Sequence, residues 1–208
     1  MPNIDDNNQN PMSAVILAGG KSMRMEEDKS LLMVSGLTLI EKIARDIGPY
    51  FREIIISVNP ETMDRYSFLP FRAVADKEPG QGPLRGILTG LQASAHPVNF
   101  VMACDIPEID GPFLQKMMWF TFTGQYDIVV PVTGEGKYEP LFAFYHRRLI
   151  PSIETLLEQG VRKVIELFPL HRVKYIPMEA ADWYYNLNTI EEYRRYMKEI
   201  KGLVKNFS

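Results

Sequence analysis

A pair of glycines followed closely by cations lies near the start of the chain. Gly19 and Gly20 come directly after an apolar run, and Lys21, Arg24 and Lys29 follow. Glycine lets the backbone approach a ligand closely, so that N–H groups and side-chain cations can hold anionic oxygens. A nucleoside triphosphate needs this combination, because cations also offset the negative charge that builds on departing pyrophosphate. The alternative is a glycine turn followed by solvated charges.

Two carboxylates follow other apolar runs of strand length. Asp76 comes after residues 72–75, and Asp105 comes after residues 100–104. Mg²⁺ binds one or two carboxylates and completes its shell with phosphate oxygens and water, so Asp105 is our first candidate for a metal ligand. The alternative is a turn or N-cap aspartate before Pro107. If the strands are parallel, both carboxylates lie at the edge of the sheet where ligands collect.

A second glycine-rich stretch, residues 80–86, opens a helix that we expect at residues 83–94. A helix N-terminus with close backbone approach could contact a base, a ribose or a phosphate, and a mobile connector is the alternative. Asn59 follows the apolar run 54–58 and could either bind a ligand or begin a turn with Pro60.

Several other kinds of site are disfavoured. The first glycine pair fits neither GxxxxGK[ST] nor GxGxxG, which argues against a kinase-type phosphate loop. No Gly-x-Ser-x-Gly elbow supports a serine hydrolase. The histidines show no metal-ligand spacing to one another, and Cys104 fits a buried strand better than a nucleophile. The histidines are His96, His146 and His171.

Composition points to a small-molecule enzyme of a reducing compartment. The chain has 208 residues, 46% of them hydrophobic, which is enough for a sizeable core. A net charge of −3 lacks the basic excess of a nucleic-acid binder. The single cysteine excludes an internal disulfide framework, so we expect the cytoplasm. Residues 1–12 are polar and resemble no signal peptide, and no apolar run approaches the length of a membrane span. We expect residues 1–12 to be a disordered tail and residues 13–208 to be one domain.

Strand-length apolar runs alternate with helical patterns, which predicts βαβ units and a mostly parallel twisted sheet. The expected class is a single-domain, three-layer, Rossmann-like α/β fold. We expect strands at residues 13–18, 53–58, 72–76, 99–105, 127–132, 140–145 and 172–176. We expect helices from Leu39 to Ile47, stopped by Gly48 and Pro49, and at residues 83–94, 112–122, 149–157, 161–168 and 190–200.

Taken together, these motifs resemble the molybdenum cofactor guanylyltransferase family, MobA. The resemblance covers residues 13–197, and the motifs match the family in order and spacing. Leu-Ala-Gly-Gly alone is shared with many nucleotidyltransferases, whereas the later segments are more specific. The motifs are residues 17–20 (LAGG), 21–25 (KSMRM), 28–29 (DK), 82–86 (GPLRG), 104–107 (CDIP), 139–141 (EPL) and 186–189 (NLNT).

The resemblance implies a nucleotide-diphospho-sugar-transferase type of fold and assigns a role to each motif. GTP would occupy the first half of the sheet, with Asn59 and Asp76 near the guanosine. Asp105 would hold Mg²⁺, and Lys29 and Arg24 would act in catalysis with it. The phosphate loop and the second glycine stretch would line the nucleotide through Leu17, Ala18, Gly19, Gly20, Lys29, Gly82, Pro83 and Leu84. Molybdopterin would face Glu139, Asn186 and Asn188.

The implied reaction transfers GMP from GTP to molybdopterin and releases pyrophosphate. The alternatives are a CTP-dependent molybdopterin cytidylyltransferase, a sugar-phosphate nucleotidyltransferase, and a non-catalytic GTP-binding subunit that delivers cofactor. Molybdoenzymes or other cofactor-biosynthesis proteins are further candidate partners. One position departs from the family pattern, because Glu26 stands where glycine is usual after Arg24-Met25 and would repel a triphosphate unless it points outward or toward the metal.

Overall fold

The computed structural model describes residues 11–18, 29–78, 80–178 and 183–205, with side chains up to Ile200. Its centre is a seven-stranded sheet with the order β5-β4-β1-β6-β8-β7-β9. All neighbouring pairs are parallel except those of β8, which runs antiparallel to β6 and β7. The strands are β1 (Ser13–Leu17), β4 (Glu53–Val58), β5 (Arg72–Ala75), β6 (Val98–Ala103), β7 (Ile128–Thr133), β8 (Phe142–His146) and β9 (Val173–Met178).

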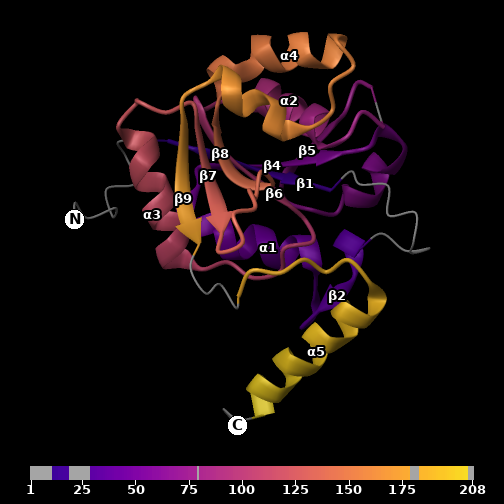
Figure 1. Cartoon of the computed structure of the whole chain (residues 1–208). Coiled ribbons are helices and arrows are strands. Elements are labelled where there is room, and N and C mark those ends of the chain that lie inside the picture. Colours follow the sequence, from indigo (N-terminus) through magenta and orange to yellow (C-terminus); the bar gives the residue numbers. More distant parts are fainter. Residues whose placement is uncertain (1–10, 19–28, 79, 179–182, 206–208) are drawn as a thin grey trace.

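Helices cover both faces of this sheet (Figure 1). The α1 helix (Leu39–Ile47) and the α3 helix (Gly111–Phe122) pack on one face, and α2 (Pro83–Ala93) and α4 (Ile150–Glu158) pack on the other. The central strand β1 is buried on both sides, because Ala14 and Ile16 join the first hydrophobic layer and Val15 joins the second. The predicted three-layer α/β architecture is therefore confirmed.

Local signals explain where two of the helices begin. The α1 helix starts with a capping box, in which Thr38 accepts from the Glu41 N–H and the Glu41 side chain accepts from the Thr38 N–H. The α2 helix begins at Pro83, after Gly82 adopts a φ of +74° that favours glycine. Gly90 lets α2 approach β1, because a Cβ at this position would lie 2.4 Å from Cγ1 of Val15.

The α5 helix (Ile190–Lys205) extends away from the sheet beside β2 (Met33–Val34; Figure 1), and the Tyr193 hydroxyl donates to the backbone oxygen of Met33 in that strand. Thr189 caps it by accepting from the Glu192 N–H at 3.2 Å. Tyr196 is buried and donates to Oε1 of Glu108 at 2.6 Å, which fastens the middle of the helix to the loop after β6. Among the described residues, no helix combines the length and the apolar composition that a bilayer crossing requires.

Three expectations need correction. The helix expected at residues 161–168 is a 3₁₀ helix, η5 (Val164–Leu170). It contains Pro169, which lacks the N–H that an α-helical bond to residue 165 would need. A short hairpin of β2 (Met33–Val34) and β3 (Leu37–Thr38) was not expected. Met12 is buried and accepts from the Arg52 N–H, so it belongs to the packed chain, whereas residues 1–10 of the expected tail lie outside the described residues.

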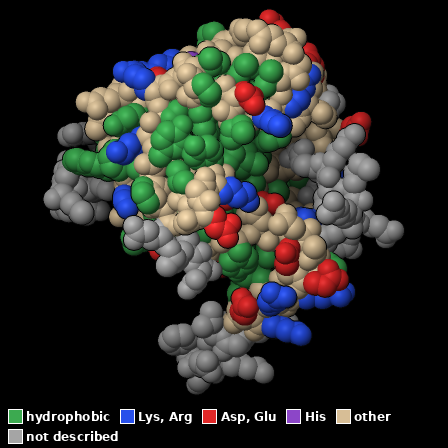
Figure 2. Space-filling view, viewed as in Figure 1, with side chains coloured by type: hydrophobic (Ala, Val, Ile, Leu, Met, Phe, Trp, Pro, Cys, Tyr) green, Lys and Arg blue, Asp and Glu red, His purple; other side chains and the backbone are tan. Residues whose placement is uncertain are grey.

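Four further 3₁₀ turns complete the described chain. They are η1 (Lys29–Leu31), η2 (Gly48–Tyr50), η3 (Pro60–Tyr66) and η4 (Arg147–Leu149). The η2 turn contains Gly48 and Pro49, the pair predicted to stop α1. Hydrophobic side chains gather on the face shown in Figure 2. The exposed large hydrophobic side chains of the described residues include Tyr138 and Tyr175, whose ring centroids lie 5.2 Å apart.

Candidate active site

The carboxyl ends of four parallel strands meet at one edge of the sheet. Ala18 follows β1, Asn59 follows β4, Asp76 follows β5, and Asp105 follows β6 by two residues. Backbone hydrogen bonds extend the ladder into these loops, since the Ala18 N–H donates to Ser57, the Asp76 N–H to Val58 and the Cys104 N–H to Leu17. The strand ends thus place the predicted residues side by side, as expected for a parallel sheet.

Asp105 has an enclosed carboxylate oxygen at this edge of the sheet. Its Oδ1 atom is inaccessible to solvent and has no hydrogen-bond partner among the described residues. Burial raises the pKa of its carboxyl, and the nearby Lys29 ammonium opposes that rise. A buried carboxylate oxygen without a donor is suited to a cation or to a ligand donor.

Lys29 connects the two halves of the site. It lies at the start of η1, and its Nζ donates to the backbone oxygen of Asn188, which precedes α5. The Leu187 N–H donates to the backbone oxygen of Asp105 at 2.8 Å. The N–H groups of Asn188 and Thr189 donate to the Glu192 carboxylate at 2.5 and 2.8 Å. Lys29, Asp105 and the predicted acceptor-side segment are therefore brought together.

Asp76 forms a second polar centre nearer the α2 helix. Burial raises the pKa of its carboxyl, while hydrogen bonds from Thr89 and Ser57 and the charge of Arg85 oppose this rise. Ser57 donates to Oδ1 of Asp76 at 3.3 Å. Asn59 begins the η3 turn without making a side-chain capping bond, so its amide is not committed to the turn. This pair lies on the β4–β5 side of the edge, apart from the segment that carries Asn188.

The second glycine-rich stretch presents backbone to the same edge. Gly82 is the N-cap of α2 and Pro83 is its first residue, at the end of the helix where N–H groups lack helical partners. Leu84 is fully buried in the hydrophobic layer under α2, so only its backbone could contact a ligand. A side chain at Gly82 would meet Arg162 at 3.6 Å, which places the loop after α4 beside it.

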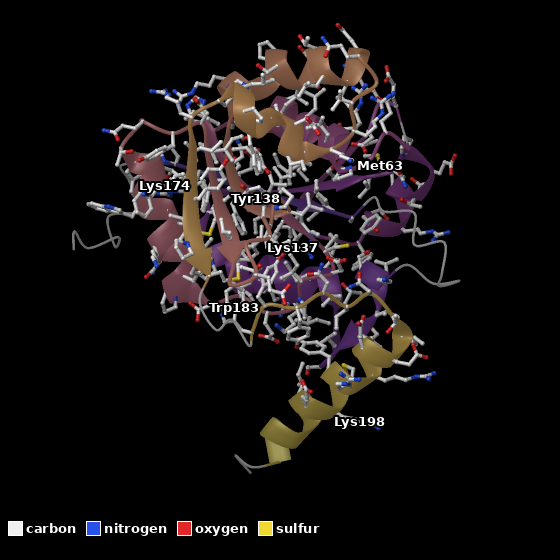
Figure 3. The ribbon with its side chains drawn as sticks, viewed as in Figure 1. Met63, Lys137, Tyr138, Lys174, Trp183 and Lys198 are labelled. Atoms are coloured by element: carbon white, nitrogen blue, oxygen red, sulfur yellow. The ribbon has the colours of Figure 1, made fainter. Side chains whose placement is uncertain are left out.

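The residues predicted for the acceptor side lie in two segments, the loop between β7 and β8 and the segment between β9 and α5. Glu139 lies in the loop before β8, and its Oε2 accepts from the Tyr184 hydroxyl at 2.9 Å. Oδ1 of Asn186 is solvent-inaccessible and has no partner among the described residues. Figure 3 labels Tyr138, from the β7–β8 loop, and Trp183, from the segment before α5, at separate places in the view. The bond from Tyr184 to Glu139 is the contact that joins the two segments.

A model of the MobA-like NTP transferase domain matches residues 14–174 of the chain. The chain belongs to this MobA-like family. A probable molybdenum cofactor guanylyltransferase of Carboxydothermus hydrogenoformans is 31% identical over 194 residues, covering 90% of this chain and 95% of the relative. A relative of the same description from Peptoclostridium acidaminophilum is 36% identical, covering 88% of this chain and 87% of the relative. The resemblance inferred from the motifs is confirmed.

Solved structures agree on the fold of this MobA-like chain. Molybdopterin-guanine dinucleotide biosynthesis protein A from Archaeoglobus fulgidus superposes with a TM-score of 0.77 at 22% identity, covering 92% of this chain and all of that chain. A Mycobacterium tuberculosis protein crystallised with manganese has a TM-score of 0.64 at 14% identity, covering 91% and 99% of the two chains.

The MobA-like site also has members that sequence reasoning missed and members that cannot be placed. Neither Tyr184 nor Glu192 is among the predicted site residues. From sequence alone Tyr184 fits either the core or a substrate-facing wall, and Glu192 fits the first turn of the last helix, whereas the structure shows Tyr184 bonded to Glu139 and Glu192 bonded to the Asn188 N–H. Of the predicted residues, Gly19, Gly20 and Arg24 lie outside the described residues, together with Lys21, Glu26 and Asp28.

The described residues contain no cluster of three or more His, Cys, Asp or Glu that could enclose a metal. A Mg²⁺ site built from Asp105 and substrate phosphate oxygens is compatible with that finding, since Mg²⁺ commonly takes a single carboxylate.

Proposed function

We propose that this chain transfers GMP from GTP to molybdopterin, forming the guanine dinucleotide cofactor and releasing pyrophosphate. The observation that carries the proposal is the convergence of Lys29, Asp105 and the backbone of Asn188, because it joins the nucleotide edge of the sheet to the acceptor-side segment. The two relatives described as probable molybdenum cofactor guanylyltransferases support the choice of substrates.

In this reaction an oxygen of the molybdopterin phosphate bonds to the α-phosphorus of GTP while the bond to the β-phosphate breaks. A phosphate monoester is already largely ionised near pH 7, because its second pKa is about 6, so no general base is required. We assign to Lys29, with Arg24, the stabilisation of negative charge on the departing pyrophosphate. Lys29 can also align the two substrates, because its ammonium lies between the segments that would bind them.

Asp105 is the residue we propose as the Mg²⁺ ligand. Its solvent-inaccessible Oδ1 has no partner among the described residues, and carboxylate oxygen is a ligand that Mg²⁺ prefers. A bound Mg²⁺ supplies positive charge that polarises the phosphate groups.

The remaining assignments divide the edge into two halves. The guanosine half consists of Asn59 and Asp76 with the α2 N-terminus, and the pterin half consists of Glu139, Asn186 and Asn188. The triphosphate would lie between the two halves, on Leu17, Ala18, Gly19, Gly20 and Lys29. Gly82, Pro83 and Leu84 would lie beside the guanosine. We also place the reaction in the cytoplasm, with molybdoenzymes or other cofactor-biosynthesis proteins as recipients.

The test is pyrophosphate release from GTP and, in parallel, from CTP, each with and without molybdopterin and Mg²⁺. We expect release that requires molybdopterin and Mg²⁺ and that is faster with GTP. Faster release with CTP would make the chain a cytidylyltransferase instead. Nucleotide binding without any release would favour a delivery subunit, and release stimulated by a sugar phosphate alone would move the chain to another branch of nucleotidyltransferases.

A further inference from the structure

Tyr184 links two acceptor-side segments that are far apart in the chain. Its hydroxyl donates to Oε2 of Glu139 at 2.9 Å, across 45 residues of sequence. We propose that Tyr184 is a positioning residue, which holds one oxygen of the Glu139 carboxylate so that the other, Oε1, faces the pterin of the acceptor. This inference rests on the proposed function, and it adds a residue that determines acceptor affinity.

The backbone around Glu139 is already fixed, so the side chain is the part that needs an anchor. The Glu139 N–H donates to Pro131 at 3.1 Å, and the Phe142 N–H donates to Glu139 at 3.1 Å. The Ala103 N–H donates to Leu141 at 2.9 Å, which ties the turn to the end of β6. A glutamate on a rigid turn still has three side-chain torsions, and one strong hydrogen bond restricts them.

Tyr184 is itself held in place by its ring. The ring meets Phe142 edge-on at 5.6 Å between centroids and meets Trp183 at 5.5 Å. Burial and the Glu139 carboxylate raise the pKa of Tyr184, so its hydroxyl stays protonated at neutral pH and acts as the donor. A rigid donor therefore faces a flexible acceptor, which is the arrangement expected of a positioning contact.

The contact lies beside the group we propose as the metal ligand. The Asp105 carboxylate contributes to the raised pKa of Tyr184, and Leu187, three residues after Tyr184, bonds to the Asp105 backbone. Among the described residues, Oε1 of Glu139 receives no hydrogen bond, whereas Oε2 is occupied by Tyr184. A pterin ring presents an amino group and a ring N–H, which are the donors that a carboxylate oxygen accepts.

The first test compares Tyr184→Phe with the wild-type chain. Phenylalanine keeps the ring contacts and removes only the donor. We expect the KM for molybdopterin to rise about tenfold or more, as for loss of a hydrogen bond to a charged group, with kcat and the KM for GTP within about twofold. The matched control is Tyr185→Phe, because Tyr185 contacts Tyr196 rather than Glu139 and should leave both KM values unchanged.

A double-mutant cycle with Glu139→Gln asks whether Tyr184 acts through the carboxylate. We expect Glu139→Gln to raise the KM for molybdopterin, and Tyr184→Phe to add less than about threefold in that background. The inference would be overturned if the two substitutions raised the KM for molybdopterin independently, so that their fold-changes multiplied in the double variant. It would also be overturned if Tyr184→Phe left that KM unchanged. Turnover of GTP and molybdopterin by the wild-type chain tests the proposed function separately. If the wild-type chain shows no turnover, both the proposed function and the positioning role of Tyr184 are overturned.

Discussion

The ammonium group of Lys29 bonds to the backbone oxygen of Asn188, a residue 159 positions later in the chain. Lys29 follows the predicted phosphate loop, and Asn188 precedes the C-terminal helix. A lysine ammonium has three donors, so a single residue can contact the acceptor-side backbone and still bind phosphate oxygens. This contact makes the geometry of the acceptor side depend on the nucleotide side.

Replacing Lys29 with methionine should impair catalysis far more than folding. Methionine retains much of the side-chain length but none of the charge. We expect kcat to fall about 100- to 1,000-fold, the range for loss of one preorganised charge-stabilising donor. Steady-state pyrophosphate release measures this, and Lys116→Met, on exposed α3 surface, is the control. A Lys29→Met chain with near-wild-type turnover would remove Lys29 from the proposed mechanism.

Asp105→Asn should stabilise the ligand-free chain while abolishing activity. The folded-state pKa of Asp105 is raised, so the folded chain binds more protons than the unfolded chain between the ordinary pKa and the raised one. Stability is therefore lost as pH rises through that window, and asparagine avoids this loss. We expect a gain in the free energy of unfolding near pH 7, because asparagine removes the buried negative charge. Urea denaturation should show the gain shrinking as pH falls toward the ordinary pKa of aspartate, and a gain that is independent of pH would contradict the assignment.

The acid limb of activity should depend on the Mg²⁺ concentration. A proton and a metal ion compete for the Asp105 carboxylate, whose raised pKa places this competition at a higher pH than for an ordinary aspartate. We expect a tenfold increase in the Mg²⁺ concentration to lower the pH at which kcat/KM reaches half its maximum by up to about one pH unit. Asp76 also has a raised pKa, so Asp76→Asn is the control: its residual activity should keep the Mg²⁺-dependent shift.

Gly90→Ala should destabilise the fold although alanine is ordinarily the better helix former. The alanine preference is worth about 1 kcal/mol, but the new Cβ would lie 2.4 Å from Cγ1 and 2.8 Å from Cγ2 of Val15, and such overpacking costs about 1–3 kcal/mol. We expect the Tm to fall by a few degrees. Adding Val15→Ala should lower the combined loss below the sum of the two single losses. Gly134→Ala, with open space around it, should leave the Tm unchanged.

Most strands and helices could be predicted from the sequence, because apolar runs and Gly or Pro residues mark them over short stretches of chain. The run Ile54–Ile56 with Val58 forms most of β4, whose bounds are those expected, and Gly48 with Pro49 stops α1 where expected. Hydrophobic periodicity carries no strand direction, however, so the antiparallel placement of β8 was not predictable from it. The β2–β3 hairpin was missed because each strand has two residues, too few for a period to show.

The sequence predicts where single residues of the candidate site lie, but it does not predict the contacts between them. Asp105 and Asp76 follow strands, and strand ends collect ligands, so their placement follows from a local rule. The bonds from Lys29 to Asn188 and from Tyr184 to Glu139 cross long stretches of sequence, and they depend on how the whole sheet is ordered. From the sequence, Tyr184 fits either the core or a substrate-facing wall, and its bond to Glu139 is visible only in the structure.

The order of the strands in the sheet has a consequence for synthesis on the ribosome. Strands β5, β4, β1 and β6 come from one continuous stretch of chain, so they can pair before the later strands have been translated. Until β8 follows, the apolar strand β6 presents an unpaired edge, which is the kind of surface that recruits other nascent chains or a chaperone. A ribosome that pauses between β6 and β8 would therefore hold a half-sheet that already carries the residues proposed to bind nucleotide and that still has an unpaired edge prone to aggregation.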